Sequence, residues 1–293
     1  MKHDLVKHGA LAGAAAQPDR ADWTIDQDWE NYSAFEHAVW KTLFGRQAKL
    51  LPSRACNEFL VGMNELAIAA DSIPDFRRLS DVLMPRTGWQ VVAVPGFVPT
   101  EVFFDHLANR RFPAGQFIRR PDQLDYIEEP DVFHDVFGHV PMLMHPALAD
   151  FLQAYGKAGL EAQRLDALDQ LSRVYWFTVE FGLLAQDDGL RIYGAGIVSS
   201  YSETRFALDS PSPNRLEFNL ARVMRTRYRI DDFEETYFVI DTLDHLLHLV
   251  DIDFAPIYEQ VKRLEEIAPG QVLAGDQVVA RGTGAYHAAK RPA

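Results

Sequence analysis

Two histidines five residues apart, His134 and His139, are the side chains in this sequence best suited to metal chemistry. They lie between Pro130 and Pro141, so we expect a short helical segment that begins near the first proline and ends at the second. Residues on one face of an α-helix are three or four apart, so a spacing of five requires a locally altered helix. Gly138 would permit that change, and both imidazoles would then converge on one metal ion. The alternative is two ordinary core or surface histidines.

A third candidate ligand is Glu180, the only charged residue between Val174 and Leu184. A carboxylate among apolar side chains has a high desolvation cost unless a cation meets it. That cation is either a metal ion or a neighbouring Arg or Lys. Together with the two histidines, Glu180 would complete a set of two histidines and one carboxylate, which is typical of mononuclear non-haem Fe(II) oxygenases.

Zinc peptidases also use two histidines and a glutamate, and they are the competing interpretation. Their H-E-x-x-H helix has histidines four apart, with a catalytic glutamate directly after the first. In this chain Asp135 takes the place of that glutamate, and the second histidine comes one residue late. The spacing weakens the hydrolase interpretation without removing it.

Composition limits the class of protein. The 293 residues are 47% hydrophobic, which is enough for a sizeable core in one large domain or two smaller ones. The formal net charge of −13 argues against nucleic acid or an anionic membrane as the main partner, and no apolar run reaches membrane-spanning length. A single cysteine, Cys56, excludes an intrachain disulfide and fits a reducing cytosol. We therefore expect a cytoplasmic protein in which Cys56 is buried.

The elements that must position the candidate ligands are mostly helical. Apolar periodicity and capping residues predict helices at 33–44, 53–67, 74–85, 100–107, 146–155, 168–184 and 242–267. Short strands are predicted at 89–94, 116–119, 190–193 and 225–230, with a hairpin around 275–276. We expect a mainly α fold with small β pieces. Its parts would be a flexible tail over 1–22, one catalytic domain over 23–269 and a C-terminal tail over 270–293.

Three stretches of the chain resemble the pterin-dependent aromatic amino acid hydroxylases: Glu129–Pro141, Tyr175–Gly182 and Tyr193–Ser200. They are long, they follow the family's order, and the resemblance extends over roughly residues 23–249. It implies the catalytic domain of that family and the hydroxylation of L-phenylalanine to L-tyrosine, with O2 and a tetrahydropterin as co-substrates. Tryptophan hydroxylation by the same chemistry remains an alternative.

The resemblance also assigns roles to single residues. A mononuclear Fe(II) would be held by His134, His139 and Glu180. Pterin binding is implied for Gly96, Phe97, Val98, Thr100, Phe103 and Asp135, with Phe103 stacked on the ring and Asp135 in place of a longer glutamate. Substrate binding is implied for Arg119, Tyr126, Pro130, Trp176 and Ser199, with Arg119 as a bidentate partner of the substrate carboxylate.

Each assignment has a simpler structural alternative. Phe103 and Trp176 would serve equally as core aromatics, and Arg119 as a surface partner of Glu129 or Asp131. Compared with the animal enzymes, the chain has neither a preceding regulatory domain nor a long C-terminal heptad helix. On these grounds we expect an unregulated monomer whose partners are small molecules.

Overall fold

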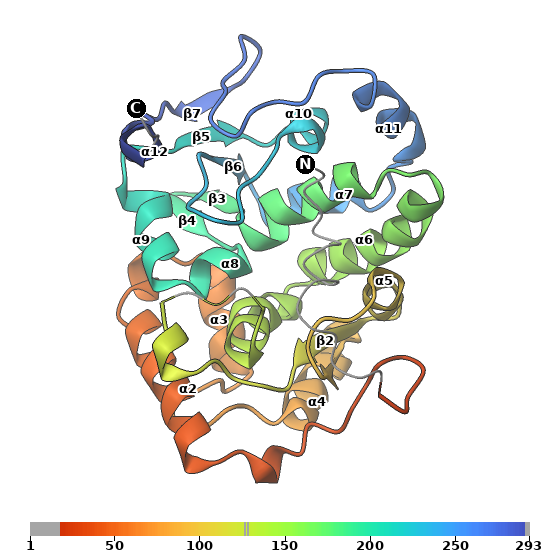
Figure 1. The fold of residues 1–293 in the computed structure, drawn as a ribbon, viewed down its shortest axis with the longest axis vertical. Coiled ribbons are helices and arrows are strands. Elements are labelled where there is room, and N and C mark those ends of the chain that lie inside the picture. The colour runs from red at the N-terminus through yellow and green to blue at the C-terminus, as the bar shows by residue number, and fades with distance from the viewer. Residues whose placement is uncertain (1–17, 126, 128, 291–293) are drawn as a thin grey trace.

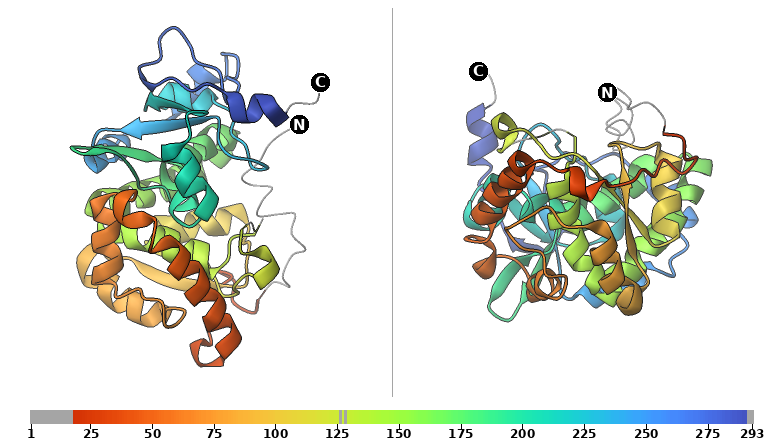
Figure 2. Two further views of the ribbon diagram at one scale, coloured as in Figure 1. Left: turned by 90° about the vertical axis from the view of Figure 1, so that its left-hand side faces the viewer. Right: turned by 90° about the horizontal axis from the view of Figure 1, so that it is seen from below.

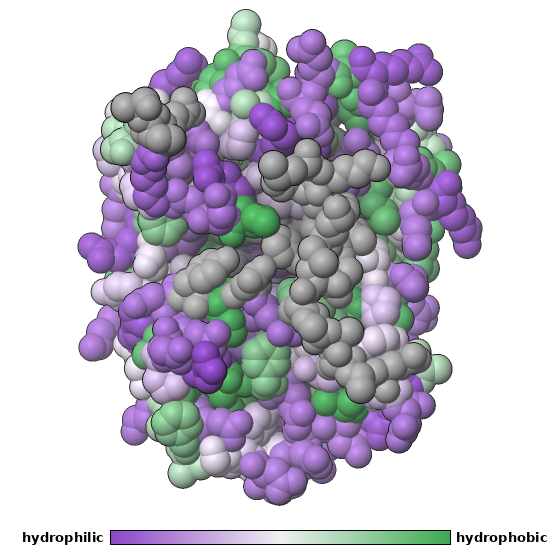
Figure 3. Space-filling view, in the orientation of Figure 1, coloured by the Kyte–Doolittle hydropathy of each residue, from purple (hydrophilic) through white to green (hydrophobic). Residues whose placement is uncertain are grey.

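The computed structural model describes residues 18–290 except 126 and 128, and the fold is mainly helical, as predicted (Figure 1). A five-stranded sheet and a two-stranded sheet accompany the helices. The face shown in Figure 3 carries mostly hydrophilic side chains over its visible atoms, with apolar ones in small scattered groups. Over the described residues, no helix combines the length and apolar character needed to span a membrane.

The first three described helices lie below the five-stranded sheet in Figure 1, and the second of them begins beside that sheet, where Gln186 donates to Glu58 at 3.0 Å (Figures 1 and 2). They are α2 (Ala34–Gln47), α3 (Asn57–Glu65) and α4 (Phe76–Thr87), with 3-10 turns at Trp29–Asn31 and Leu51–Ser53. Ser33 caps α2 in a capping box with Glu36, and Asp75 caps α4. The predicted cap at Ser53 is wrong, because Ser53 ends a 3-10 turn and α3 begins after Cys56. Cys56 is buried, as expected, and burial raises the pKa of its thiol to about 12.

The two-stranded sheet is a parallel pair joined by a helix. Its strands are β1 (Gln90–Val94) and β2 (Arg111–Gly115), and α5 (Thr100–Ala108) connects them. The predicted strand at 116–119 is wrong, since the pairing stops at Gly115. Pro113 obscured β2, because proline in a strand is tolerated only at an edge, and β2 has a single neighbour.

The middle of the chain contains two π-helices, which are widened by hydrogen bonds from residue i to i+5. The first covers Phe133–His139 and continues as a 3-10 helix over Val140–Met144. The predicted end of this helical segment at Pro141 is therefore wrong. After α6 (Pro146–Arg164) and α7 (Leu168–Tyr175), the second π-helix covers Trp176–Glu180. The helix predicted over 168–184 ends at Glu180, because Leu183 and Leu184 belong to β3.

The five-stranded sheet is assembled from distant parts of the chain in the order β4-β3-β6-β5-β7. Its strands are β3 (Leu183–Gln186), β4 (Gly189–Ile192), β5 (Asn214–Glu217), β6 (Thr236–Ile240) and β7 (Val278–Ala280). The helices in this part are α8 (Ala195–Val198), α9 (Tyr201–Asp209), α10 (Leu220–Arg225), α11 (Ala255–Val261) and α12 (Ala285–Lys290).

Two predicted elements between residues 225 and 267 are wrong. Residues 225–230 are the end of α10 followed by a loop, not a strand. The helix predicted over 242–267 is a 3-10 helix at Leu243–Leu249 and the short α11, whose Pro256 starts a helix because it has no N–H for an interior hydrogen bond.

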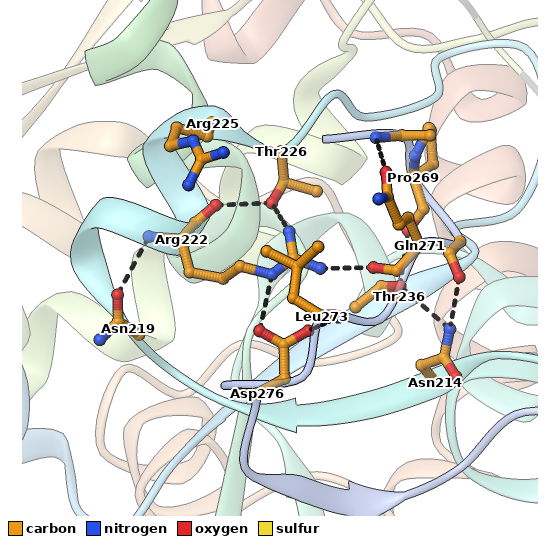
Figure 4. A network of polar contacts seen from close by, with 12 residues as sticks. Asn214, Asn219, Arg222, Arg225, Thr226, Thr236, Pro269, Gln271, Leu273 and Asp276 are labelled. Atoms are coloured by element: carbon orange, nitrogen blue, oxygen red, sulfur yellow. Dashed lines mark hydrogen bonds and ion pairs between the residues drawn. The ribbon is translucent and has the colours of Figure 1, made fainter. Parts of the chain in front are cut away.

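The described part of the expected C-terminal tail packs on the rest of the molecule. In place of a hairpin around residue 275, β7 pairs antiparallel with β5. The buried Arg222 donates from Nε to Asp276 at 2.9 Å and from Nη2 to the carbonyl of Gln271 (Figure 4). The expected N-terminal tail, 1–22, lies mostly outside the described residues.

Candidate active site

His134 and His139 lie on the first π-helix, and this explains their spacing. The wider turn brings residues five apart onto one face, and the two Nε2 atoms are 3.2 Å apart. Gly138 has a role that we did not predict. A Cβ at this position would lie 2.9 Å from the carbonyl oxygen of Ala195, so glycine allows α8 to pack against the π-helix.

Glu180 ends the second π-helix and faces both histidines. Its Oε1 lies 3.2 Å from Nε2 of His139, and its Oε2 lies 3.6 Å from Nε2 of His134. Two ligand atoms at right angles, each about 2.1 Å from a metal ion, are roughly 3 Å apart. The three donor atoms are therefore spaced as a shared metal ion requires.

The protonation states also suit metal binding. Nδ1 of His134 is 3.0 Å from Oγ of Ser199, which donates its own proton to the carbonyl of Ala195 at 2.7 Å. The serine oxygen must then accept from Nδ1–H, which leaves the lone pair on Nε2 of His134 free. Burial lowers the pKa of His134 to about 4, so this imidazole is neutral at pH 7. Burial opposes ionisation of Glu180, but the positive charge that His139 and His134 carry when protonated, with hydrogen bonds from His139 and the Gly196 N–H, outweighs it and lowers the pKa.

A cavity of about 570 Å³ opens onto the triad, a size usual for small-molecule sites. Its wall includes every described residue to which the sequence assigned pterin or substrate binding: Gly96, Phe97, Val98, Thr100, Phe103, Asp135, Arg119, Pro130, Trp176 and Ser199. The remaining candidate, Tyr126, lies outside the described residues.

The predicted pterin residues are held in the cavity wall by contacts with their neighbours. The backbone N–H of Phe97 donates to Oε1 of Glu129 at 3.2 Å, and a Cβ on Gly96 would lie 2.3 Å from the same oxygen. Phe103 is half-buried and meets Tyr175 edge-on, with ring centroids 6.0 Å apart. The carboxylate of Asp135 accepts the N–H of Gly115 at 2.8 Å, yet burial dominates and raises the pKa of Asp135 to about 7.

Arg119 forms a buried bidentate pair with Asp131. Its Nε and Nη2 each lie 2.8 Å from a different oxygen of that carboxylate. Asp131 is fully buried and also accepts the backbone N–H of His134 at 3.0 Å. The expected surface pair is thus an internal one. Two of the five guanidinium N–H donors are used, and Arg119 still lines the cavity.

Trp176 both packs in the protein and lines the cavity. Its ring stacks on Tyr228 with centroids 4.3 Å apart and on Phe181 at 4.7 Å. The indole Nε1 donates to Oε1 of Glu234 at 2.8 Å. The side chain is therefore held from behind while part of it remains available to a ligand.

Residues 27–259 match the profile of the biopterin-dependent aromatic amino acid hydroxylases, which is most of the chain. The chain belongs to this family. The family membership agrees with the two-histidine, one-glutamate cluster and gives no support to the zinc hydrolase alternative.

Several relatives of this hydroxylase are phenylalanine-4-hydroxylases. The one from Caulobacter vibrioides is 56% identical over 286 residues, which is 98% of this chain and 96% of the relative. The one from Ralstonia nicotianae is 55% identical over 280 residues, 96% of this chain and 90% of the relative. The crystal structure of phenylalanine hydroxylase from Chromobacterium violaceum with bound iron and phenylalanine is 50% identical. It has a TM-score of 0.85 and covers 94% of this chain and 100% of that chain.

Three acidic residues support the cavity wall of the hydroxylase, and sequence reasoning gave none of them this role. It named Asp131 and Glu129 only as possible surface partners of Arg119 and did not single out Glu234. Asp131 lies three residues before His134, and an acidic residue at that spacing before a helical turn is a usable capping signal. Glu129 accepts the backbone N–H of Phe97, and no pattern in the sequence indicates this contact. Glu234 is 58 residues from Trp176, so only the folded chain reveals their contact.

Proposed function

We propose that this hydroxylase converts L-phenylalanine to L-tyrosine with O2 and a tetrahydropterin, at a mononuclear Fe(II) held by His134, His139 and Glu180. The observation that carries the proposal is the spacing of the three donor atoms, 3.2 to 3.6 Å, at the wall of one cavity. The naming of the relatives favours phenylalanine over tryptophan as the substrate.

The donor set suits Fe(II). A neutral imidazole and an ionised carboxylate are the forms that bind a metal ion, and both follow from the contacts at the cluster. Three protein ligands on one side leave coordination positions open for small molecules. Bound in this cavity, the iron and the tetrahydropterin together supply the activation of O2.

The protein's own side chains orient the reactants. Ser199 keeps His134 in the tautomer that presents Nε2 to the metal. Asp131 fixes the plane of the Arg119 guanidinium, whose remaining N–H groups pair with the amino acid's carboxylate. Trp176 and Pro130 confine the aromatic ring. The family resemblance also assigns Tyr126 to substrate binding. The half-buried face of Phe103 stacks on the pterin, while the backbone of 96–98, Thr100 and Asp135 bind its polar edge.

Excluding water completes this arrangement. The triad lies in a wall rich in aromatic side chains, among them Phe112, Tyr175 and Phe181. Their rings give the wall around the triad apolar surface, from which a bound aromatic amino acid would displace water.

We further propose a cytoplasmic monomer with no nucleic-acid or membrane partner, supported by the single buried cysteine and the net charge of −13. The catalytic unit begins near Trp23 and, through the packing of β7 and α12, extends to Lys290 rather than ending at 269. A sedimentation mass near 33 kDa is expected, and a mass near four subunits would contradict the proposal.

The test is oxygen-dependent formation of tyrosine from phenylalanine in the presence of Fe(II) and a tetrahydropterin, with tryptophan as the competing substrate. We expect tyrosine as the main product and none without O2. Absence of tyrosine from protein shown to hold iron would indicate another aromatic substrate. Zinc in place of iron, with peptide or ester turnover, would restore the hydrolase alternative.

A further inference from the structure

The segment Arg229 to Glu234, called the wall loop from here on, closes one side of the active-site cavity. Five of its six residues line the cavity: Arg229, Ile230, Asp231, Asp232 and Phe233. The loop lies between α10 and β6 and has no regular secondary structure. Its position must therefore come from side-chain contacts rather than from a hydrogen-bonded ladder.

On the inner side, the loop is joined to Trp176 through one buried carboxyl group. Oε1 of Glu234 accepts the indole N–H at 2.8 Å and the backbone N–H of Arg229 at 3.0 Å. Glu234 is only 1% exposed. The two ends of the wall loop and the aromatic side chain of the cavity are thus linked at a single oxygen atom.

On the outer side, the loop is held by the C-terminal helix α12, which lies beside α9 (Figure 1). Nζ of Lys290 lies 2.8 and 2.9 Å from the two carboxylate oxygens of Asp232, and the hydroxyl of Tyr286 donates to the first of them at 2.9 Å. Nε2 of His287 is 2.8 Å from the carbonyl of Phe233. The ring of Phe233 stacks on Phe206 of α9, with centroids 4.4 Å apart.

The charge of Lys290 has a direct bearing on the cavity. Asp231 and Asp232 are adjacent, and both line a cavity that must admit the carboxylate of an amino acid. Arg229 pairs with Asp231 at 3.0 Å, and Lys290 pairs with Asp232. Without Lys290, Asp232 would present an uncompensated negative charge that repels the substrate and also releases the loop.

We propose that α12, through Lys290 and Tyr286, positions the wall loop for binding of the amino acid substrate. This inference rests on the proposed function, which places the amino acid against Trp176. Lys290 touches neither the triad nor the pterin residues, so it acts as a positioning residue through Asp232. Its loss should weaken amino acid binding and leave the chemistry and the pterin site intact.

The experiment compares Lys290→Met with Lys290→Arg in the full chain, with Arg263→Met as the matched control. Arg263 also forms an ion pair on the surface, with Glu259 at 3.5 Å, away from the wall loop. For Lys290→Met we expect the KM for phenylalanine to rise about three- to tenfold, and kcat and the KM for tetrahydropterin to stay within about twofold. Lys290→Arg should restore most of the wild-type KM, and Arg263→Met should not change it.

A second readout does not depend on catalysis. Hydrogen exchange of a peptide covering residues 227–238 should be faster in Lys290→Met than in the wild type or in Arg263→Met. If the wild type forms no tyrosine, the proposed function fails, and exchange together with calorimetric binding of phenylalanine still tests the role of α12. Unchanged exchange would overturn the inference, as would faster exchange with unchanged phenylalanine affinity, or an equal effect of Arg263→Met.

Discussion

The two sides of the active-site cavity are built in different ways. The proposed iron side consists of three donor atoms on two π-helices, and its geometry is set by the backbone of a few consecutive residues. The wall loop, another part of the cavity lining, has no regular backbone structure, and its position depends on contacts with Trp176 and with α12. One part of the cavity wall is therefore fixed by local backbone structure, and the other by contacts between distant segments of the chain.

This difference predicts two kinds of response to substitution. On the iron side, each donor is needed for one ion, so a single change should remove the activity. Around the wall loop, several contacts together hold the backbone in position. Loss of any one of them should therefore change the free energy of unfolding or the substrate affinity by a limited amount. A wall-loop variant that abolishes the reaction, or an iron-side variant that only raises a KM, would break the comparison.

The largest effect is expected for Glu180→Ala on the iron side. Loss of the only carboxylate ligand should reduce tyrosine formation at least about 100-fold, since even outer-shell partners of a metal are worth 10- to 100-fold. Bound iron and product formation are the quantities to measure. Glu65→Ala, at the exposed end of α3, is the control and should behave as the wild type. Full iron content and activity in Glu180→Ala would refute the ligand assignment.

Asp131→Asn should have the next largest effect, on stability. It leaves the charge of Arg119 buried without its carboxylate, which should lower the free energy of unfolding by about 3 to 5 kcal/mol. Urea unfolding of the two proteins measures this difference. The control is Asp122→Asn, whose exposed pair with Arg120 should be worth less than about 1 kcal/mol. Equal effects of the two substitutions would contradict the buried pair.

Glu203→Gln tests the pH response behind the wall loop. Burial raises the pKa of Glu203 to about 7 from an ordinary 4.5, even though the hydroxyl of Tyr237 donates to it. Between these two values the folded chain keeps a proton that the unfolded chain releases, so the free energy of unfolding falls as the pH rises. The loss amounts to about 3 kcal/mol from pH 4.5 to 7 and should be absent in the variant. If the free energy of unfolding falls equally with pH in the wild type and in Glu203→Gln, Glu203 is not protonated in the folded chain.

The smallest of these effects is expected for Ser199→Ala. Without the acceptor for Nδ1–H, His134 loses its fixed tautomer, and iron affinity should fall about tenfold. Titration of the protein with Fe(II) measures the affinity. Ser202→Ala removes a hydroxyl from the same cavity and should leave the affinity unchanged. If Ser202→Ala weakens iron binding as much as Ser199→Ala does, the hydrogen bond to His134 is not the cause.

Sequence reasoning succeeded where the relevant neighbours are close in the chain. The helix starts predicted at 33, 74 and 146 match α2, α4 and α6 in the structure to within two residues. It failed where pairing with distant segments decides the conformation. The strand at 111–115 exists because β1 pairs with it, although its own proline and glycine argue against a strand.

For the site, residue types were predictable and their supports were not. An isolated glutamate in an apolar helix and two histidines beside a glycine pointed to metal chemistry. The spacing of five between the histidines predicted a locally altered helix, but only the structure shows that the alteration is a widened π-helix. Glu234 contacts Trp176, and Lys290 contacts Asp232. The partners are 58 residues apart in each case, so only the folded chain reveals these contacts.

The sequence alone determined the mainly helical class and the family resemblance and led to the three proposed donors, because these depend on residue type, order and local periodicity. Tertiary structure decided how the donors meet, which carboxylate orients Arg119 and what holds the wall loop. The physical reason is that burial and long-range hydrogen bonds select among local conformations of similar energy, and those selections appear only when distant segments pack together.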